Sequence, residues 1–306
     1  MDFNIEAKQE GRVLLNYLRQ ELSLSRACIT ALKQTEDGIL LNGRHVTVRA
    51  QLAEGDLLSL KLEDREEQQS EHGIVPRQLP FDILYEDQDV IAVNKPANMP
   101  THPSHGHYED TLANAAAWYF QEKHRPFVFR AINRLDRDTS GIVLLAGNRR
   151  AAAILSQRMQ EQQFQKQYTA VLFGNLPQDS GEIRMPIRRK LPSIIEREVC
   201  APGEGADAVT RFEVLRRIGR LTVVAAYPKT GRTHQLRVHF SAIGFPIAGD
   251  SLYGTAQSAS CAVRQALHCS SLSFPHPDSG TVTVTAPLPE DIRKLLSQEE
   301  ELLQHE

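Results

Sequence analysis

The sequence lacks the features that mark disulfide-rich, metal-stapled or membrane proteins. Its four cysteines (Cys28, Cys200, Cys261 and Cys269) form no C-x-x-C pair and have no histidine at zinc-finger spacing. We therefore expect neither a disulfide framework nor a structural metal. The N-terminus is polar and acidic, unlike a signal peptide, and apolar runs such as residues 141–147 are far too short to cross a bilayer. These absences predict a cytoplasmic globular protein with no membrane partner.

A strong excess of charge is also missing. The 306 residues carry a formal net charge of −3, which argues weakly against a nucleic-acid partner. The distribution is uneven, because residues 211–237 contain seven lysines and arginines and one acid, Glu213. Such a segment can form a basic face or merely scattered surface charge, and charge alone leaves both interpretations open.

A small unit is predicted near the N-terminus. Helical spacing of apolar residues predicts helices over residues 12–21 and 26–34. Asn42-Gly43 predicts a hairpin turn between two short strands. The first domain is thus expected to span residues 1–62 as an α/β unit of two helices and a few short strands.

A solvated linker is predicted next. The stretch from Glu63 to His72 contains no apolar residue, so it cannot bury surface. We place an acidic linker at residues 63–79 and a large second domain at residues 80–306.

The second domain mixes strands and helices without regular alternation. The pattern predicts strands over residues 90–94, 141–146, 168–173, 211–215, 221–227 and 281–285, and helices over residues 112–121, 149–163, 234–243 and 290–304. Because strands adjoin strands as often as helices, the order favours an α+β architecture over a doubly wound parallel sheet.

One polar loop holds a carboxylate in a setting suited to chemistry. Asp136 lies between Arg134 and Arg137, shortly before the apolar run 141–146. Neighbouring arginines favour an ionised carboxylate, and the Thr-Ser-Gly at residues 139–141 suits a tight turn that fixes its direction. A carboxylate held on a rigid element can act as a nucleophile, although an ordinary charged loop has the same composition.

A second polar segment runs from Lys229 to Phe240. A glycine-containing turn, with Thr233 as its candidate cap, is predicted to open the helix. Arg232 and Arg237 can each hold a phosphate or a carboxylate with two hydrogen bonds. The two histidines of the segment are five residues apart, poor spacing for one helical face, so we expect structural hydrogen bonds there instead of a metal site.

A third segment, residues 165–171, contains Tyr168 at the start of a predicted strand. Lys166 and Ala170 flank it in a Lys-x-Tyr-x-Ala pattern. From the residues alone, a buried strand tyrosine is the simpler interpretation.

Together these segments resemble the RluA-type family of RNA pseudouridine synthases. The family's His-Arg-Leu-Asp-x-x-Thr-Ser-Gly signature stands here as residues 133–141, with asparagine in the first place. Its Thr-Gly-Arg-Thr-His-Gln-Ile/Leu-Arg-Val-His run matches residues 230–239, and its Lys-x-Tyr-x-Ala motif matches residues 166–170. Further matches, in the same order along the chain, are Asn94-Lys95-Pro96 with His102-Pro103, Pro246 to Gly254, and Leu267-His268 to His276-Pro277.

The resemblance implies a fold and an activity. The fold is a mixed, largely antiparallel β-sheet with flanking helices. The activity is an isomerase that converts uridine to pseudouridine in structured RNA, most often large-subunit ribosomal RNA and in other members transfer RNA. No redox step or external group takes part, so no cofactor is implied. By resemblance Asp136 is the nucleophile, Tyr168 stacks on the uracil and assists proton removal, and Arg237 pairs with Asp136.

The same resemblance implies the substrate-binding residues. Arg134 would fill the gap left by a flipped uridine, and Leu236 would pack against the uracil. Thr139 and Arg232 complete this set. Asp136 would attack the sugar or abstract from it, so a covalent adduct and a glycal intermediate both stay open.

The first 60 residues resemble the S-four-like RNA-binding domain. The residues that match its pattern are Ser25-Arg26, Leu41-Asn42-Gly43, Arg49 and Gly55-Asp56. We therefore expect Arg12, Arg26 and Arg49 to contact RNA. The alternative is a small decoration without RNA contact.

Asn133 stands where the family usually has histidine, and this difference leaves a second function open. Asparagine does not titrate near neutral pH, which leaves a non-catalytic RNA-binding or ribosome-assembly protein on the same fold as an alternative. Because the Asp, Arg and Tyr positions are kept, we expect a structural role for this position. A glycoside hydrolase using Asp136 and Asp138 as its carboxylate pair is a further alternative that fits poorly. We expect a monomer that requires no protein partner.

Overall fold

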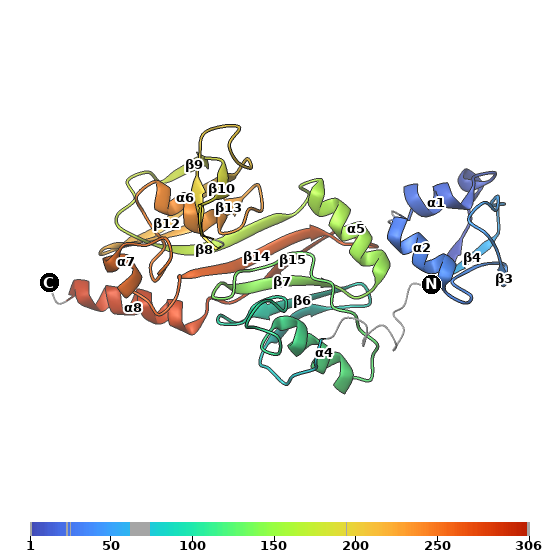
Figure 1. The fold of residues 1–306 in the computed structure, drawn as a ribbon, viewed down its shortest axis with the longest axis horizontal. Helices are drawn as coiled ribbons and strands as arrows, with labels where there is room; N and C mark the ends of the chain where they lie inside the picture. The colour runs from blue at the N-terminus through green and yellow to red at the C-terminus, as the bar shows by residue number, and fades with distance from the viewer. Residues whose placement is uncertain (1, 23, 25, 62–73, 194, 305–306) are drawn as a thin grey trace.

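The protein builds two main hydrophobic cores. The computed structural model describes residues 2–22, 24, 26–61, 74–193 and 195–304, with only the backbone of residues 26–28. One core is formed within residues 5–60 and the other within residues 90–296. The smaller unit lies at one end of the molecule and the C-terminal helix at the opposite end (Figure 1).

The N-terminal unit is a four-stranded antiparallel sheet with two helices. Its elements are β1 (Asp2–Asn4), a 3-10 helix (Ala7–Gln9), α1 (Leu14–Gln20), α2 (Arg26–Gln34), β2 (Ile39–Leu41), β3 (Arg44–His45) and β4 (Leu57–Leu60). The strand order is β1-β4-β2-β3. Asn42 and Gly43 have φ values of 53° and 74°, as a two-residue hairpin turn with both central residues left-handed requires. The predicted hairpin is therefore confirmed.

The large unit is an α+β domain built on a mixed sheet, as predicted. Among the described residues the sheet has nine strands in the order β5-β6-β7-β14-β8-β13-β12-β9, with β15 beside β14. All these pairings are antiparallel except β7 with β14. The strands are β5 (Asp82–Glu86), β6 (Val90–Lys95), β7 (Ser140–Ala146), β8 (Gln165–Phe173), β9 (Ser180–Arg184), β12 (Val209–Ile218), β13 (Leu221–Pro228), β14 (Leu267–Pro275) and β15 (Thr281–Thr285).

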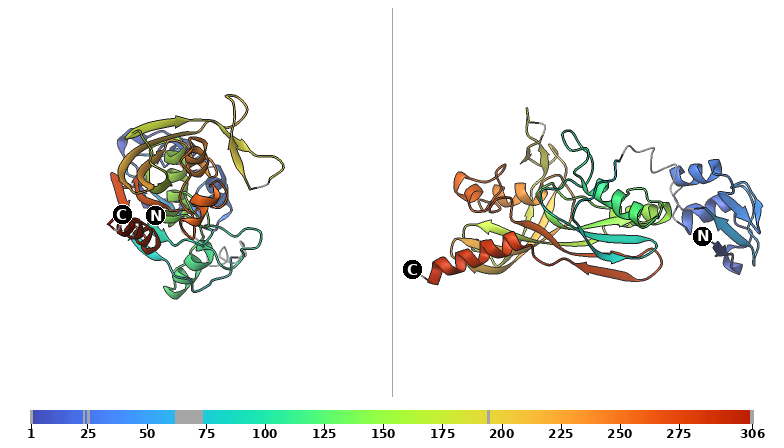
Figure 2. Two further views of the ribbon diagram at one scale, coloured as in Figure 1. Left: turned by 90° about the vertical axis from the view of Figure 1, so that its left-hand side faces the viewer. Right: turned by 90° about the horizontal axis from the view of Figure 1, so that it is seen from below.

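Helices cover the sheet, and a separate hairpin projects from it. The helices are α4 (Leu112–Glu122), α5 (Arg149–Gln160), α6 (Gln235–Ala242), α7 (Ala256–Ser260) and α8 (Glu290–Gln304). Helix α5 packs on β7, α6 on β12 and β13, and α8 on β12. The hairpin consists of β10 (Ile187–Arg189) and β11 (Arg197–Val199), and it stands out from the body of the molecule in the end-on view (Figure 2).

The large sheet forks where β7 and β14 separate. The two strands pair only at His268–Ser140 and Cys269–Gly141. Gly141 has φ +111°, and a Cβ there would lie 2.3 Å from the carbonyl oxygen of Cys269. Only glycine tolerates this close approach. Beyond these two pairs, this edge of β7 no longer contacts β14, and the loop that precedes β7 lies along it instead.

The predicted linker falls largely outside the described residues. Its described end, residues 74–79, is held by α4, because the Asn114 side-chain amide donates to the carbonyl oxygen of Val75 and the Asn114 backbone carbonyl accepts from Arg77 N–H. The N-terminal unit touches the large domain through α2 and α5, and the Arg150 guanidinium lies 5.9 Å from the ring centre of Phe3. No helix in the described part of the chain is long and apolar enough to span a membrane.

Candidate active site

A cavity of about 940 Å³ opens beside the fork in the sheet. The loop before β7, the start of β8 and the segment from Tyr227 to Arg237 line its walls. The seven residues predicted from the sequence as catalytic or substrate-binding all line this one cavity: Arg134, Asp136, Thr139, Tyr168, Arg232, Leu236 and Arg237. They come from three separate stretches of sequence, which the fold brings together.

Asp136 lies on the tight turn that its sequence predicted. The Thr139 N–H donates to the carbonyl oxygen of Asp136 at 3.1 Å, which closes the turn. The Asp136 side chain is 23% exposed and faces the cavity. Asp138 instead forms an ion pair with Arg137 and contributes nothing to the cavity wall. Asp136 and Asp138 are therefore not assembled as a carboxylate pair around this cavity.

Three side chains anchor the loop of Asp136, namely Lys95, Thr101 and Arg264. None of them had been assigned a role from the sequence. Lys95 is fully buried and its ammonium donates to the carbonyl oxygens of Pro96, Met99 and Arg137 at 2.8, 2.7 and 3.1 Å. The Thr101 hydroxyl bonds both the N–H and the carbonyl of Leu135. Arg264 donates to the carbonyl oxygen of Asp138 on the other side. Lys95 was visible in the sequence as part of the Asn-Lys-Pro motif, but its partners were not.

Asn133 acts as a substitute peptide group at the open edge of β7. Its Nδ2 donates to the Ile142 carbonyl at 3.0 Å and its Oδ1 accepts from Leu144 N–H at 2.8 Å. A carboxamide carries a donor and an acceptor side by side, as a peptide group does. The side chain therefore extends the hydrogen-bond ladder of β7 where β14 has diverged. These contacts support the structural role expected for this position.

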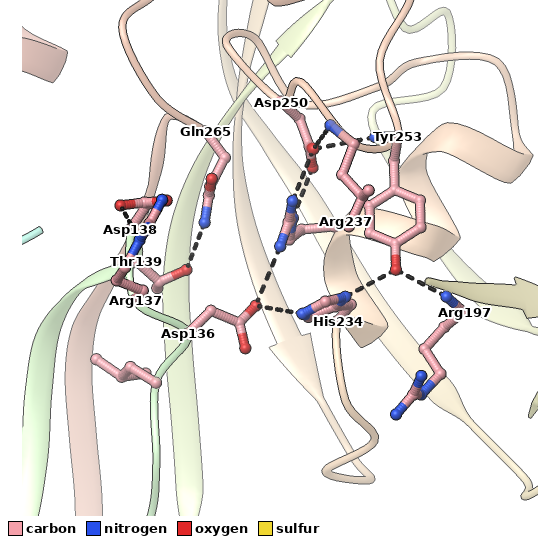
Figure 3. Close-up of polar contacts among 12 residues, drawn as sticks. Asp136, Arg137, Asp138, Thr139, Arg197, His234, Arg237, Asp250, Tyr253 and Gln265 are labelled. Atoms are coloured by element: carbon pink, nitrogen blue, oxygen red, sulfur yellow. Dashed lines mark hydrogen bonds and ion pairs between the residues drawn. The ribbon is translucent and has the colours of Figure 1, made fainter. Parts of the chain in front are cut away.

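Arg237 is held by Asp250 and directed at Asp136. Its Nε and Nη2 donate to the two Asp250 oxygens at 2.7 and 2.8 Å. Its Nη1 lies 3.6 Å from Oδ2 of Asp136 (Figure 3). Asp250 is fully buried and also accepts from the N–H groups of Leu252 and Tyr253. The motif at residues 246–254 is therefore the support for the arginine.

Tyr168 is buried on β8 with its ring in the cavity wall. Burial raises the pKa of its phenol well above the ordinary value, and the nearby Cys269 and Asp136 act in the same direction. The hydroxyl is therefore protonated at neutral pH.

The turn before α6 differs in one detail from the prediction. The helix is capped by His234, in a left-handed conformation with φ +59°, and Thr233 is not the cap. The turn is instead fastened by Gln235, whose Oε1 accepts from Thr230 Oγ1 and from Arg232 N–H, while its Nε2 donates to the Val209 carbonyl. The left-handed conformation of His234 could not be predicted from local propensity, because the surrounding packing imposes it.

The basic segment 211–237 divides into two groups. Arg211, Lys229 and Arg232 line the cavity beside Arg237. The other three basic residues pair with acids elsewhere: Arg216 with Glu300, Arg217 with Asp179 and Arg220 with Glu299. Both interpretations left open by the sequence thus apply, each to part of the segment.

The two histidines of the second motif have separate partners. His239 is fully buried and bonds Thr210 Oγ1 and the Met185 carbonyl, while His234 faces Asp136 and Tyr253. Within the described ranges, no group of three His, Cys, Asp or Glu side chains could hold a metal ion.

The predicted RNA contacts of the N-terminal unit are only partly visible. Arg12 forms an ion pair with Glu21 and Arg49 is exposed, whereas the side chain of Arg26 lies outside the described atoms. Neither Arg12 nor Arg49 lines the cavity.

Comparison with known families identifies the architecture around this cavity. Residues 89–242, half of the chain, match the model of the RNA pseudouridylate synthase family. The chain belongs to this family. The synthase is therefore an isomerase that converts uridine to pseudouridine in RNA, and the predictions of family, fold and activity are confirmed.

Individual relatives agree with the family model. The synthase is 41% identical to the uncharacterised RNA pseudouridine synthase YjbO of Bacillus subtilis over 91% of its own chain and 96% of the relative. It is 35% identical to the ribosomal large subunit pseudouridine synthase D of Neisseria meningitidis serogroup A, over 86% of its chain and 72% of the relative. A solved structure, the human RNA pseudouridylate synthase domain containing 1, covers 72% of the synthase with 94% of its own chain, at 26% identity and a TM-score of 0.58.

Proposed function

We propose that this synthase modifies uridines of large-subunit ribosomal RNA, with Asp136 as the nucleophile. The observation that carries the assignment of Asp136 is its place in the cavity, 3.6 Å from a guanidinium that is itself held by Asp250. The choice of ribosomal RNA is supported by the relative from Neisseria, whose name gives that substrate. Transfer RNA is the alternative substrate.

The reaction takes place on a uridine that has flipped out of its helix. Extrusion of the base from the RNA costs about a few kcal/mol. Arg134 is exposed at the mouth of the cavity and fills the gap that the base leaves in the RNA. Asp136 attacks C1′ as the bond from C1′ to uracil N1 breaks, or else abstracts a sugar proton to give a glycal. The freed uracil turns and its C5 bonds to C1′ as the bond from C1′ to Asp136 breaks, or as the glycal regains the abstracted sugar proton. The C5 proton is then lost and N1 takes up a proton. Atoms balance without a cofactor.

Tyr168 and Leu236 form the apolar side of the uracil site. Both are buried and line the cavity. Stacking on an aromatic ring is worth roughly 1–3 kcal/mol per base. Because burial raises the pKa of the Tyr168 phenol, we assign it to stacking and hydrogen bonding, and not to proton removal as a phenolate.

Phosphate contacts are assigned to the basic residues on the cavity wall. Arg211, Lys229 and Arg232 lie there. Contacts of this kind position the RNA and do not read its base sequence. Arg12, Arg26 and Arg49 of the N-terminal unit extend the RNA contact in this proposal, with Arg12 released from Glu21 on binding. This unit acts as the S-four-like domain, and the linker tethers it to the catalytic domain.

We infer that the synthase works as a cytoplasmic monomer. One chain supplies every residue assigned to the site, so a second copy is not needed to complete it. Cys200, Cys261 and Cys269 are free thiols, which suits a reducing compartment.

Asp136→Asn tests the nucleophile. We expect turnover to vanish in a tritium-release assay on RNA carrying [5-³H]uridine, with RNA affinity within a few-fold of wild type, because the amide keeps the shape and loses the nucleophilic oxygen. Asp138→Asn is the matched control and should retain activity, since Asp138 lies off the cavity wall. Exchange of the C5 proton by purified Asp136→Asn would reject the assignment and leave the non-catalytic role open.

The substrate is tested by mapping pseudouridines in cells with and without the gene. Loss of signals from large-subunit ribosomal RNA supports the proposal. Loss confined to transfer RNA selects the alternative.

A further inference from the structure

His234 lies directly between Asp136 and Tyr253. It occupies the left-handed position at the start of α6, which turns its ring into the cavity instead of onto the helix surface. Its two ring nitrogens have different neighbours (Figure 3): Nδ1 is 2.7 Å from the Tyr253 hydroxyl, and Nε2 is 3.9 Å from Oδ2 of Asp136. Neither contact was anticipated from the sequence.

The hydroxyl of Tyr253 selects the tautomer of this histidine. Its oxygen accepts the backbone N–H of Arg197 at 2.9 Å, from strand β11. The hydroxyl's own proton is then free to point at Nδ1 of His234. With Nδ1 as the acceptor of that proton, the neutral ring carries its hydrogen on Nε2, the nitrogen that faces Asp136.

The ring is neutral at neutral pH. Burial lowers the pKa of His234, opposed by the charge of Asp136 and reinforced by Arg237. A neutral imidazole with hydrogen on Nε2 is a hydrogen-bond donor to a carboxylate and does not cancel its charge.

Arg237 and His234 both approach the same oxygen of Asp136. The Arg237 Nη1 is 3.6 Å and the His234 Nε2 is 3.9 Å from Oδ2. Neither contact involves the other oxygen, Oδ1 (Figure 3). Catalytic hydrogen bonds often reach their short length of about 2.6–3.2 Å only in the complex with substrate.

We propose that His234 is a positioning residue, which together with Arg237 holds Oδ2 of Asp136 so that Oδ1 is the oxygen that attacks the sugar. This inference rests on the proposed role of Asp136 as the nucleophile. The bond that forms is Oδ1 to C1′ and the bond that breaks is C1′ to N1 of uracil; the proton on Nε2 stays on the histidine throughout. Tyr253, through the Arg197 backbone, keeps that proton on the correct nitrogen.

Two substitutions of His234 separate donation from packing. In His234→Gln the amide Nε2 replaces the ring Nε2 as a donor, and we expect kcat within about three-fold of wild type. In His234→Leu no donor remains, and we expect kcat to fall by about 10- to 100-fold with KM little changed. Both residues meet the same backbone strain at φ +59°, so thermal unfolding should shift alike. Equal kcat values for the two variants would overturn the proposal.

Tyr253→Phe tests the relay. The substitution keeps the ring that lies 5.0 Å from the Arg237 guanidinium and removes only the hydroxyl. The Nδ1 atom then loses its hydrogen-bond donor. Because only the neutral ring accepts that hydrogen bond, its loss raises the pKa of His234, and the acidic limb of the kcat–pH profile should move to higher pH. The charged groups that face His234 are Asp136, Arg237, Arg197 and Asp250, and all four are retained.

The double variant completes the test. In the His234→Leu background, Tyr253→Phe should cause no further loss of kcat and no shift of the profile. A loss as large as in the wild-type background shows that Tyr253 acts elsewhere and rejects the relay. Asp136→Asn separates the two proposals: activity in that variant rejects the nucleophile itself, whereas an inactive Asp136→Asn beside a fully active His234→Leu rejects this inference alone.

Discussion

At the scale of single residues, Asp250 determines where Arg237 points. Its carboxylate is fully buried and accepts two hydrogen bonds from Arg237 and two from backbone N–H groups. Burial by itself raises the pKa of Asp250, but the hydrogen bonds and charge of Arg237 outweigh it, so that the pKa lies below the ordinary value of 3.8. A buried pair of this kind aligns the site and is costly to break.

Asp250→Asn should therefore reduce both stability and activity. We expect a loss of about 3–5 kcal/mol in the free energy of unfolding, because the Arg237 charge stays buried without its partner. We expect kcat to fall about 100-fold as Arg237 moves away from Asp136. Urea unfolding and tritium release measure the two effects. Asp179→Asn, which removes the exposed partner of Arg217, is the control and should change stability by less than about 1 kcal/mol.

The same pair sets an acid dependence of stability. The pKa of Asp250 is lower in the folded state than its ordinary value of 3.8, so the unfolded chain takes up the proton first as the pH falls. The stabilisation is present above pH 3.8 and is lost as the pH falls through the lower folded-state pKa. Wild type should lose more stability than Asp250→Asn across that range. Equal losses in both proteins would contradict this assignment.

At the scale of elements, the loop of Asp136 depends on contacts from β6 and from the chain that precedes β14. Lys95, at the end of β6, binds carbonyl groups in the turn at residues 96–99 and in the Asp136 loop. Arg264 precedes β14 and holds the same loop from the other side. The loop is therefore fixed by strands that are distant in sequence, which is how a polar segment acquires a rigid carboxylate.

Lys95→Met should release this loop. We expect the free energy of unfolding to fall by about 2–4 kcal/mol at pH 9.5, because buried carbonyl groups lose their donor, and kcat to fall with it.

Burial lowers the pKa of Lys95 from 10.5 to about 7. The unfolded chain thus binds more protons between these values, and the contribution of Lys95 to stability rises with pH over that window. Unfolding at pH 7 and pH 9.5 should show a rise in wild type relative to Lys95→Met; parallel curves would refute it.

Elements with a clear periodic pattern were predictable and others were not. The helices at 112–121 and 290–304 were predicted within a residue of α4 and α8, because their apolar spacing is local information. Strand β14 was missed. Its residues include serines and a histidine, and they become buried only because β7, β8 and β15 all pair with this strand. The β10–β11 hairpin was also missed, since its charged residues show no apolar alternation.

At the scale of the whole molecule, the two units are joined by few contacts. The Phe3–Arg150 contact and the approach of α2 to α5 connect them, and each has its own core. The cavity lies entirely within the larger unit. Binding of RNA and chemistry on the bound uridine can therefore be separated experimentally.

Removal of residues 1–73 should weaken RNA binding more than it slows chemistry. We expect the Kd for structured RNA to rise at least about ten-fold, because basic contacts are lost, with kcat at saturating RNA within about three-fold. Fluorescence anisotropy and single-turnover tritium release measure the two. Arg49→Glu in the intact chain should reproduce part of the affinity loss. An unchanged Kd in the truncated protein would argue for a decorative unit.

The sequence by itself determined the parts whose physical cause is local. These are the helices with apolar periodicity, the Asn-Gly hairpin, the turn after Asp136, and the motif residues that line the cavity. Tertiary structure alone decided what those residues do to one another. The left-handed turn at His234, the tautomer that Tyr253 imposes on it and the hold of Asp250 on Arg237 each join segments distant along the chain. Such contacts follow from the packing of the folded chain, and local spacing in the sequence does not encode them.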